Sequence, residues 1–157
     1  MASTDRFRNT LALTVALAVL GCAATLPTFA ALGEDATSVD TDIAKMKGQS
    51  RATAVAGYTV KEIALPSGTT VREYVSAEGK VFAVTWNGMS QPDLQQTLGT
   101  YFEQYESAAA APHDGHHHLS INQDNFVLVT GGHMRAWHGK AYVPALVPPG
   151  FSVDDLQ

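Results

Sequence analysis

Hydrophobic residues follow three patterns along this chain. An apolar run covers residues 11–20, alternation of apolar and polar residues covers 57–86 and again 125–147, and a helical spacing covers 92–110. Alternating runs rich in β-branched and aromatic residues predict strands, whereas apolar residues three or four positions apart predict a helix. We therefore expect an N-terminal apolar segment, then strands, a helix and more strands.

The first alternating region predicts an antiparallel meander of three strands. Turn-forming residues at 66–68 and 77–80 separate its runs. Side chains two positions apart on a strand point to the same face. Phe82, Val84 and Trp86 are therefore expected to share the core face of the third strand.

The helical spacing predicts one long amphipathic helix from Pro92 to about Ala110. Proline suits the first helical position because the missing N–H would be unpaired there anyway. The positions of the apolar stripe are Leu94, Leu98, Tyr101, Phe102, Tyr105 and Ala108. Polar residues occupy the remaining positions, so we expect the helix to pack on one face of the sheet.

The second alternating region predicts another meander. Gly131-Gly132 is typical of a two-residue hairpin turn, and it would separate strands at 125–130 and 133–138. A third run covers 141–147. Pro144 within that run predicts an edge strand, because proline cannot donate a hydrogen bond to a neighbouring strand.

These elements predict an α+β fold: an antiparallel sheet of about five to six strands, in two meanders, with one long amphipathic helix packed on a face. The chain divides into a signal peptide (1–30), an N-terminal segment with a short helix capped by Ser38 (31–56) and a single α+β domain (57–157). Residues 49–56 lack a clear period and are expected to be a connector. The expected core consists of Tyr58, Val60, Ile63, Val71, Val75, Phe82, Val84, Trp86, Leu94, Leu98, Phe102, Val127, Val129, Met134 and Val143.

Residues 1–30 are expected to be an export signal. Arg6 and Arg8 form a basic start, the apolar run follows, and Thr28-Phe29-Ala30 offers the small residues that a signal peptidase reads. The apolar run is too short to cross a bilayer, which needs about 20 residues. The mature protein is therefore expected in the periplasm or outside the cell, without a transmembrane span.

Cys22, the single cysteine, leaves a second processing route open. Val19-Leu20-Gly21-Cys22 is similar to a lipoprotein box, and lipid on Cys22 would hold the domain at a membrane surface. Cleavage after Ala30 is favoured, because Leu20 stands where lipoprotein signals usually carry a smaller residue. On either route the mature domain has no pair of cysteines for an internal disulfide.

Charge argues against a nucleic-acid binder. The chain carries 15 acidic and 10 basic residues, a formal net charge of −5, and loss of Asp5, Arg6 and Arg8 with the signal leaves 14 and 8, a charge of −6. Binding to a polyanion needs a basic patch, and no basic cluster is present in the sequence. We expect a protein partner or a small ligand in the cell envelope.

One stretch has the composition of a metal site. His113, Asp114, His116, His117 and His118 place four imidazoles and a carboxylate close together, and such groups bind Zn²⁺, Cu²⁺ or Ni²⁺. No other cofactor is indicated. The alternative is a polar surface loop that binds metal adventitiously, because consecutive histidines on a loop cannot all point to one ion.

A second candidate is a ligand or partner surface formed by His133, Arg135, Trp137 and Tyr142. On one continuous strand, the first three of these would share a face. A cation beside an aromatic ring and a histidine suits an anionic or carbohydrate ligand. The alternative is an ordinary set of solvent-facing side chains.

No catalytic residue is predicted. The sequence lacks a Gly-x-Ser-x-Gly elbow, a His-Glu-x-x-His motif and a glycine-rich phosphate loop before a helix. Glu62 and Glu73 lie on neighbouring predicted strands, but beside Lys61 and Arg72 they are more simply a solvated charged face. An enzyme whose site is assembled from scattered polar residues stays open as a further hypothesis.

Several segments resemble a known family. They are Ala31-Leu32-Gly33-Glu34-Asp35, Tyr58-Thr59-Val60, Leu65-Pro66-Ser67-Gly68-Thr69, Val71-Arg72-Glu73-Tyr74-Val75, Gly79-Lys80-Val81-Phe82-Ala83-Val84-Thr85-Trp86, Pro92-Asp93-Leu94 and Gly131-Gly132-His133-Met134-Arg135-Ala136. Together they are similar to a family of short exported proteobacterial proteins catalogued as a domain of unknown function, over nearly all of the mature chain. The resemblance favours cleavage before Ala31 and does not extend to the His-rich stretch.

The resemblance implies no reaction, cofactor or site residue. We therefore expect an exported, non-catalytic binding or accessory domain of the cell envelope. A periplasmic transition-metal-binding protein that uses the His-rich stretch is one alternative, and an enzyme with an unrecognised site is another.

Overall fold

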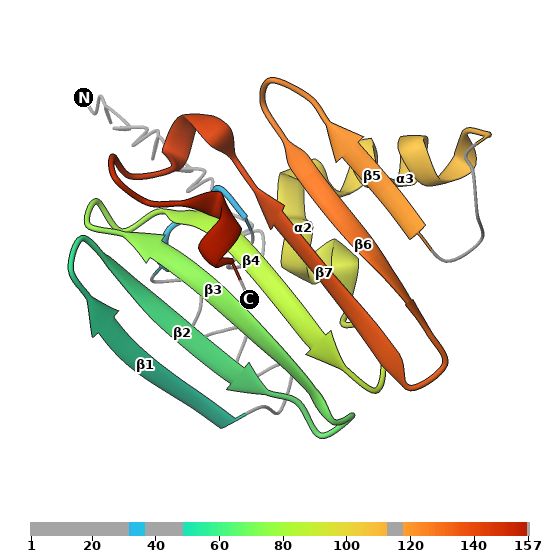
Figure 1. Cartoon of the computed structure of the whole chain (residues 1–157), viewed down its shortest axis with the longest axis horizontal. Coiled ribbons are helices and arrows are strands. Elements are labelled where there is room, and N and C mark those ends of the chain that lie inside the picture. Colours follow the sequence, from blue (N-terminus) through green and yellow to red (C-terminus); the bar gives the residue numbers. More distant parts are fainter. Residues whose placement is uncertain (1–31, 37–48, 113–117, 157) are drawn as a thin grey trace, which may run out of the picture.

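The computed structural model describes residues 32–36, 49–112 and 118–156. Within them, one sheet contains seven strands, and every neighbouring pair is antiparallel (Figure 1). The strands are β1 (Gln49–Val55), β2 (Tyr58–Ala64), β3 (Thr69–Ser76), β4 (Val81–Gly88), β5 (His118–Asn122), β6 (Val127–His133) and β7 (Ala136–Tyr142). In the sheet order β1-β2-β3-β4-β7-β6-β5, two meanders are joined by the pairing of β4 with β7.

The predicted α+β class with two meanders is confirmed, but the sheet has seven strands instead of five to six. The two strands that were not predicted, β1 and β5, form the edges of the sheet. β1 lies where a connector was expected, and all its side chains are exposed; in β5 only Ile121 is buried. A strand such as β1, which has no buried face, has no apolar alternation from which to predict it; β5 does alternate, with Leu119 and Ile121 turned toward the core, but this short signal was missed.

The β6–β7 hairpin turns at Met134-Arg135, so the prediction that Gly131-Gly132 forms the turn is wrong. The two glycines are paired within β6, and His133 pairs with Ala136 to close the hairpin. Arg135 has a φ of 69°, which is uncommon for a residue with a side chain. Met134 is 84% exposed and does not belong to the core.

β7 ends at Tyr142, so the predicted strand at 141–147 is wrong. Pro144 opens the 3₁₀ helix η3 (Pro144–Leu146), where its fixed φ suits the first helical position. β7 also lies between β4 and β6, and not at an edge. The chain then continues to a further 3₁₀ helix, η4 (Val153–Asp155).

The long helix lies in the predicted region, but it begins at Leu94 and not at Pro92, which precedes the N-cap Asp93, and it is broken near its middle. It consists of α2 (Leu94–Leu98), the 3₁₀ turn η2 (Gly99–Tyr101) and α3 (Phe102–Ala110). Gly99 has a φ of 52°, a left-handed value that interrupts the α-helix and that glycine adopts readily. Asp93 caps α2, because its carboxylate accepts a hydrogen bond from a backbone N–H of the first turn at 3.1 Å. None of the described helices is long and apolar enough to cross a membrane.

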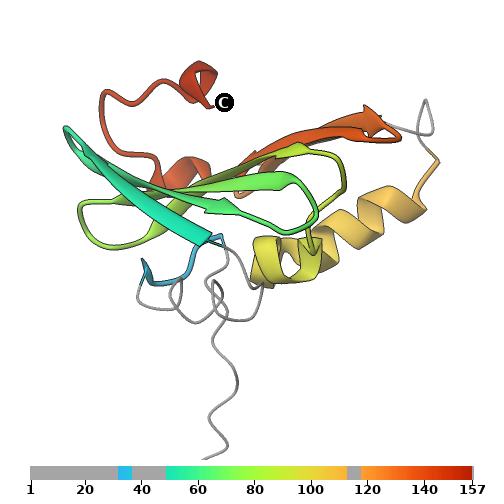
Figure 2. The same ribbon diagram turned by 90° about the horizontal axis from the view of Figure 1, so that it is seen from below.

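The sheet separates two unequal layers (Figure 2). α2, α3 and the 32–36 segment lie against one side, called here the helix face, and residues 143–156, the C-terminal segment, cross the other side, called the C-terminal face. The main core lies on the helix face. Its buried residues are Leu32, Ile63, Val71, Val75, Val81, Val84, Trp86, Leu94, Leu98, Ile121, Phe126, Leu128, Ala141 and Val143.

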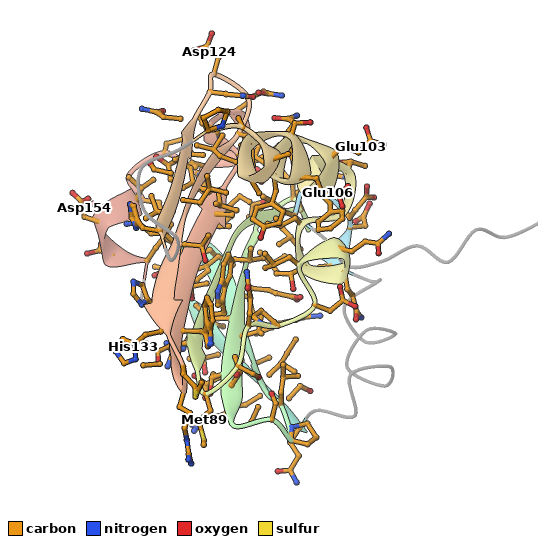
Figure 3. The ribbon with its side chains drawn as sticks, turned by 90° about the vertical axis from the view of Figure 1, so that its right-hand side faces the viewer. Met89, Glu103, Glu106, Asp124, His133 and Asp154 are labelled. Atoms are coloured by element: carbon orange, nitrogen blue, oxygen red, sulfur yellow. The ribbon has the colours of Figure 1, made fainter. Side chains whose placement is uncertain are left out.

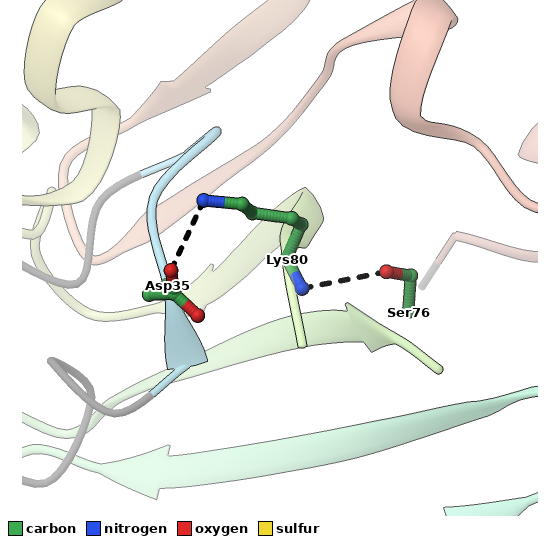
Figure 4. Close-up of polar contacts among 3 residues, drawn as sticks. All are labelled: Asp35, Ser76 and Lys80. Atoms are coloured by element: carbon green, nitrogen blue, oxygen red, sulfur yellow. Dashed lines mark hydrogen bonds and ion pairs between the residues drawn. The ribbon is translucent and has the colours of Figure 1, made fainter. Parts of the chain in front are cut away.

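The 32–36 segment is built into this core. Leu32 is 0% exposed, and its N–H donates to the carbonyl oxygen of Thr97 at 3.3 Å. The carboxylate of Asp35 pairs with the Lys80 ammonium at 3.1 Å (Figure 4). The short helix predicted from Ser38 lies outside the described residues.

An irregularity between β3 and β4 changes which residues of β4 face the main core. The register shifts between Tyr74 and Val75, so Val81 joins Val84 in the main core, whereas Phe82 packs on the C-terminal face. The prediction that Phe82 shares a face with Val84 is therefore wrong. One extra residue in a strand reverses the alternation beyond it, and strict alternation cannot anticipate that residue.

Phe82 belongs to an aromatic cluster that holds the C-terminal segment against the sheet. The ring of Phe151, from that segment, lies 4.9 Å from the ring of Phe82, 5.1 Å from Tyr58 and 6.0 Å from Tyr74, measured between centroids. All three contacts are edge-on, an arrangement that aromatic rings favour. The cluster covers one part of the C-terminal face.

Candidate functional site

Polar side chains occupy the part of the C-terminal face next to the aromatic cluster. In an antiparallel pair, residues in register lie side by side on the same face. Arg72, Thr85 and Lys140 form one such row across β3, β4 and β7. Asn87 and His138 form the next row.

A cleft of about 290 Å³ lies over these rows and is called here the β4–β7 cleft. The C-terminal segment forms one wall through Leu156, which is only 7% exposed. The lining residues are Thr85, Trp86, Asn87, Val129, His138, Gly139, Lys140 and Leu156. The floor of the cleft is thus made by two central strands of the sheet.

The polar side chains of the cleft are suited to donate hydrogen bonds, and none of its lining residues is acidic. The Lys140 ammonium donates to the carbonyl oxygen of Val153 at 3.3 Å, which uses one of its three donor hydrogens. Thr85 is buried, whereas Asn87 and His138 are exposed. This arrangement suits a ligand group that accepts hydrogen bonds and carries negative charge.

On the side of Thr85 away from Lys140, the same row of in-register residues ends in an ion pair between Arg72 and Glu62. The Arg72 guanidinium donates to the carboxylate of Glu62 at 2.8 Å, and both side chains are partly exposed. Glu73, in contrast, is 2% exposed and lies on the helix face, in register with Lys61 and Val84. The prediction of a solvated charged face therefore applies to Glu62 and is wrong for Glu73.

A family model described as a protein of unknown function (DUF2844) matches residues 28–156. The chain belongs to the DUF2844 family. The match takes in every described strand and helix and all residues of the β4–β7 cleft. Full-length membership of a family of unknown function, predicted from the resemblance, is thereby confirmed. No curated protein and no solved structure matches the chain.

The fold of this DUF2844 domain separates the four residues of the predicted contact surface. Arg135 lies in the hairpin turn. Trp137 lies on the helix face, because it is an even number of positions from the core residue Ala141 on the same strand. His133 and Tyr142 lie on the C-terminal face. His133 projects from the same side as Asp154 (Figure 3), and Tyr142 is half-buried against the aromatic cluster.

Of the predicted metal ligands, only His118 lies within the described residues, where it begins β5 and is exposed. The predicted ligands and the lipidation site outside those residues are His113, Asp114, His116, His117 and Cys22. In the part of the chain that the structure describes, no group of three or more His, Cys, Asp or Glu side chains is placed to hold a metal ion.

Sequence reasoning missed Thr85, Asn87 and Lys140 as site residues of the DUF2844 domain. A signal was present on β4, where Thr85 and Asn87 alternate with Val84 and Trp86. Polar residues on one face of a buried strand indicate that this face is not fully covered. The pattern does not say which strand lies beside β4, and so it could not bring Lys140 next to Thr85.

Proposed function

We propose that the DUF2844 domain is an exported, non-catalytic binding or accessory domain of the cell envelope, and that the β4–β7 cleft binds a small anionic ligand. The observation that carries this proposal is the lining of the cleft. A lysine, a histidine, an amide and a hydroxyl converge there without a carboxylate. Because the protein as a whole is acidic, a donor-rich cleft is a local departure from its overall charge.

Size and shape favour a small ligand over a protein partner at this position. A volume of about 290 Å³ is close to the lower end of the range for small-molecule sites, roughly 300–1,000 Å³. Val129 and Leu156 supply apolar contacts beside the polar groups. A carboxylate or phosphate group attached to a short apolar body is the ligand chemistry that matches this lining.

The proposal assigns binding and no reaction to the cleft. A nucleophile needs a base in hydrogen-bond reach, and that base is usually oriented by a third group. Thr85 and His138 lie in different rows of the sheet, and the lining has no acidic side chain to orient the imidazole. These groups therefore suit holding an anion.

Export is part of the proposal and is supported by the sequence. The basic start, the apolar run and the small residues before Ala31 have the order of a signal peptide. Leu32, the second residue of the expected mature chain, is fully buried, so cleavage after Ala30 would leave a chain that enters the core almost at once.

Binding is tested by titrating the full chain with inorganic phosphate and with acetate, and by following backbone amide signals by NMR. We expect saturable shifts at Thr85, Asn87 and Lys140. Lys140→Gln, which keeps a polar side chain but shortens it by one bond and removes its charge, should weaken binding about tenfold or more, because a charge-assisted hydrogen bond is lost.

Lys80→Gln is the matched control, since Lys80 is partly exposed and pairs with Asp35 away from the cleft. It should leave the affinity unchanged. Equal losses in the two variants, or no saturable shift in the cleft, would contradict the proposed site.

Export is tested separately by the intact mass of the protein recovered from the cell envelope. A mass that corresponds to a chain beginning at Ala31 supports export as a free domain. A mass that includes lipid on Cys22 would mean that the domain is anchored to a membrane.

A further inference from the structure

Two histidines that are far apart in the sequence face each other across one glycine of the sheet. His118 on β5 is in register with Gly131 on β6, and Gly131 is in register with His138 on β7. Residues in register share a face, so both imidazoles lie on the C-terminal face. Between them the central strand carries no side chain.

The spacing of the strands suits two ligands to one ion. Neighbouring strands are about 4.8 Å apart, so the backbones of His118 and His138 are separated by two such intervals. Imidazoles that lean toward each other over Gly131 can reach a common point above it, because no Cβ occupies that space. Both histidines are exposed, so solvent has access to the remaining coordination positions.

We propose that His118 and His138 form a two-imidazole site for a transition-metal ion above Gly131. Neutral imidazole is a preferred ligand of Zn²⁺, Cu²⁺ and Ni²⁺, whereas Mg²⁺ and Ca²⁺ require oxygen ligands. Neither in-register neighbour of this pair, Gly131 or Asn87, carries a carboxylate. The site therefore selects a nitrogen-preferring ion and leaves several positions to water or to a further ligand.

This site is separate from the anion-binding role of the cleft. His138 belongs to both the pair and the cleft lining, but His118 does not line the cleft, and Lys140 does not belong to the pair. The two proposals are distinguished by variants: His118→Ala removes a metal ligand and leaves the cleft lining intact, whereas Lys140→Gln changes the cleft and leaves both imidazoles in place.

The test is calorimetric titration of the untagged full chain with Zn²⁺ alone, and then with Ni²⁺ alone. We expect one saturable site. His118→Ala and His138→Ala should each weaken it more than about tenfold, because each removes one of only two protein ligands. The double variant should lose the site altogether, because neither protein ligand remains. Paramagnetic Ni²⁺ should broaden the ring-proton signals of these two histidines first.

Two controls keep the assignment falsifiable. A variant with His113, His116 and His117 all changed to alanine should retain the site, and so should His133→Ala, which removes an exposed histidine of the same face. If the triple variant abolishes binding and His138→Ala does not, the ion is held by the His-rich stretch and the proposal is wrong. The absence of any stoichiometric site in the unaltered chain would overturn it as well. Circular dichroism checks that each variant is folded.

Discussion

The two faces of the sheet are built from the same strands but are covered to different extents. On the helix face, Val84 and Trp86 are almost fully buried, and the Trp86 ring lies so close to Gly139 that an added Cβ would collide with it. On the C-terminal face, the aromatic cluster covers one part of the sheet. The β4–β7 cleft and the two-histidine pair lie on the other part.

This difference explains how the cleft residues are held in place. Thr85 and Asn87 alternate along β4 with Val84 and Trp86, so the packing of the helix face fixes the backbone that carries the cleft. Side chains on packed strands are positioned more accurately than side chains on loops. The helix face therefore supplies the stability, and the C-terminal face supplies the polar groups of the cleft.

The largest expected effect is the loss of packing on the helix face. Trp86→Ala should lower the free energy of unfolding by about 3–5 kcal/mol, because a buried ring is removed and the space is only partly refilled. Urea denaturation of the full chain measures the change. Asn87→Ala, one residue further along the same strand on the other face, should change stability by less than about 0.5 kcal/mol. Similar losses in the two variants would refute the assignment of faces.

The same contrast explains how much of the fold was predictable from the sequence. The broken helix and the central strands β3 and β4 carry apolar residues at regular spacings, because each packs at least one face against the core. β1 could not be predicted, since an edge strand with exposed side chains shows no such spacing. β5 does show it at Leu119 and Ile121, but over only two apolar positions, and it was missed. The β6–β7 turn was misplaced because Arg135 adopts a left-handed conformation that the neighbouring glycine pair was expected to provide.

The candidate site was less predictable than the fold. His133 and Arg135 share a face only if one continuous strand runs through residues 134–135, where the structure has the hairpin turn. The cleft depends on β4 lying beside β7, a pairing between two meanders that no local pattern indicates. His118 and His138 are likewise brought to one face by two successive strand registers, and neither register can be obtained from composition.

A smaller loss is expected when the cover of the C-terminal face is removed. Phe151→Ala deletes the ring that contacts Phe82, Tyr58 and Tyr74. Phe151 is only half-buried, so the loss should be about 2 kcal/mol, within the range for partial burial of an aromatic side chain. Urea denaturation measures this value. Hydrogen exchange should rise in the C-terminal segment and stay unchanged in α2. A loss as large as that of Trp86→Ala would mean that the two faces contribute equally.

A gain in stability is expected at the tip of the hairpin, which belongs to neither face. Arg135 has a φ of 69°, and a residue with a Cβ is disfavoured in that conformation by about 1–2 kcal/mol. Arg135→Gly should therefore raise the midpoint of thermal unfolding and stabilise the chain by about 0.5–1 kcal/mol, after allowance for the greater freedom of glycine when unfolded. Arg135→Ala retains the Cβ and should give no such gain. Equal gains in both variants would point to the lost charge as the cause.

The smallest effect is expected in the β3–β4 turn. There the Lys80 ammonium pairs with Asp35 of the 32–36 segment, and the backbone N–H of Lys80 donates to the Ser76 hydroxyl (Figure 4). A hydrogen bond from Ser76, with a further one from its own backbone, lowers the pKa of the Glu78 carboxyl below 4.5. A carboxyl whose pKa is lower in the folded state contributes stability above its unfolded pKa, and this contribution disappears as the pH falls through the folded pKa.

Ser76→Ala should therefore raise the pKa of Glu78 part of the way toward 4.5, because the backbone hydrogen bond remains. The stability difference between the original chain and the variant should narrow as the pH is lowered through this range. A ¹³C titration of the Glu78 carboxyl by NMR measures the pKa directly. Because Glu78 is fully exposed, solvent screens its interactions, and the effect on stability should be smaller than those of the Trp86, Phe151 and Arg135 variants. An unchanged Glu78 pKa would show that Ser76 does not act on it.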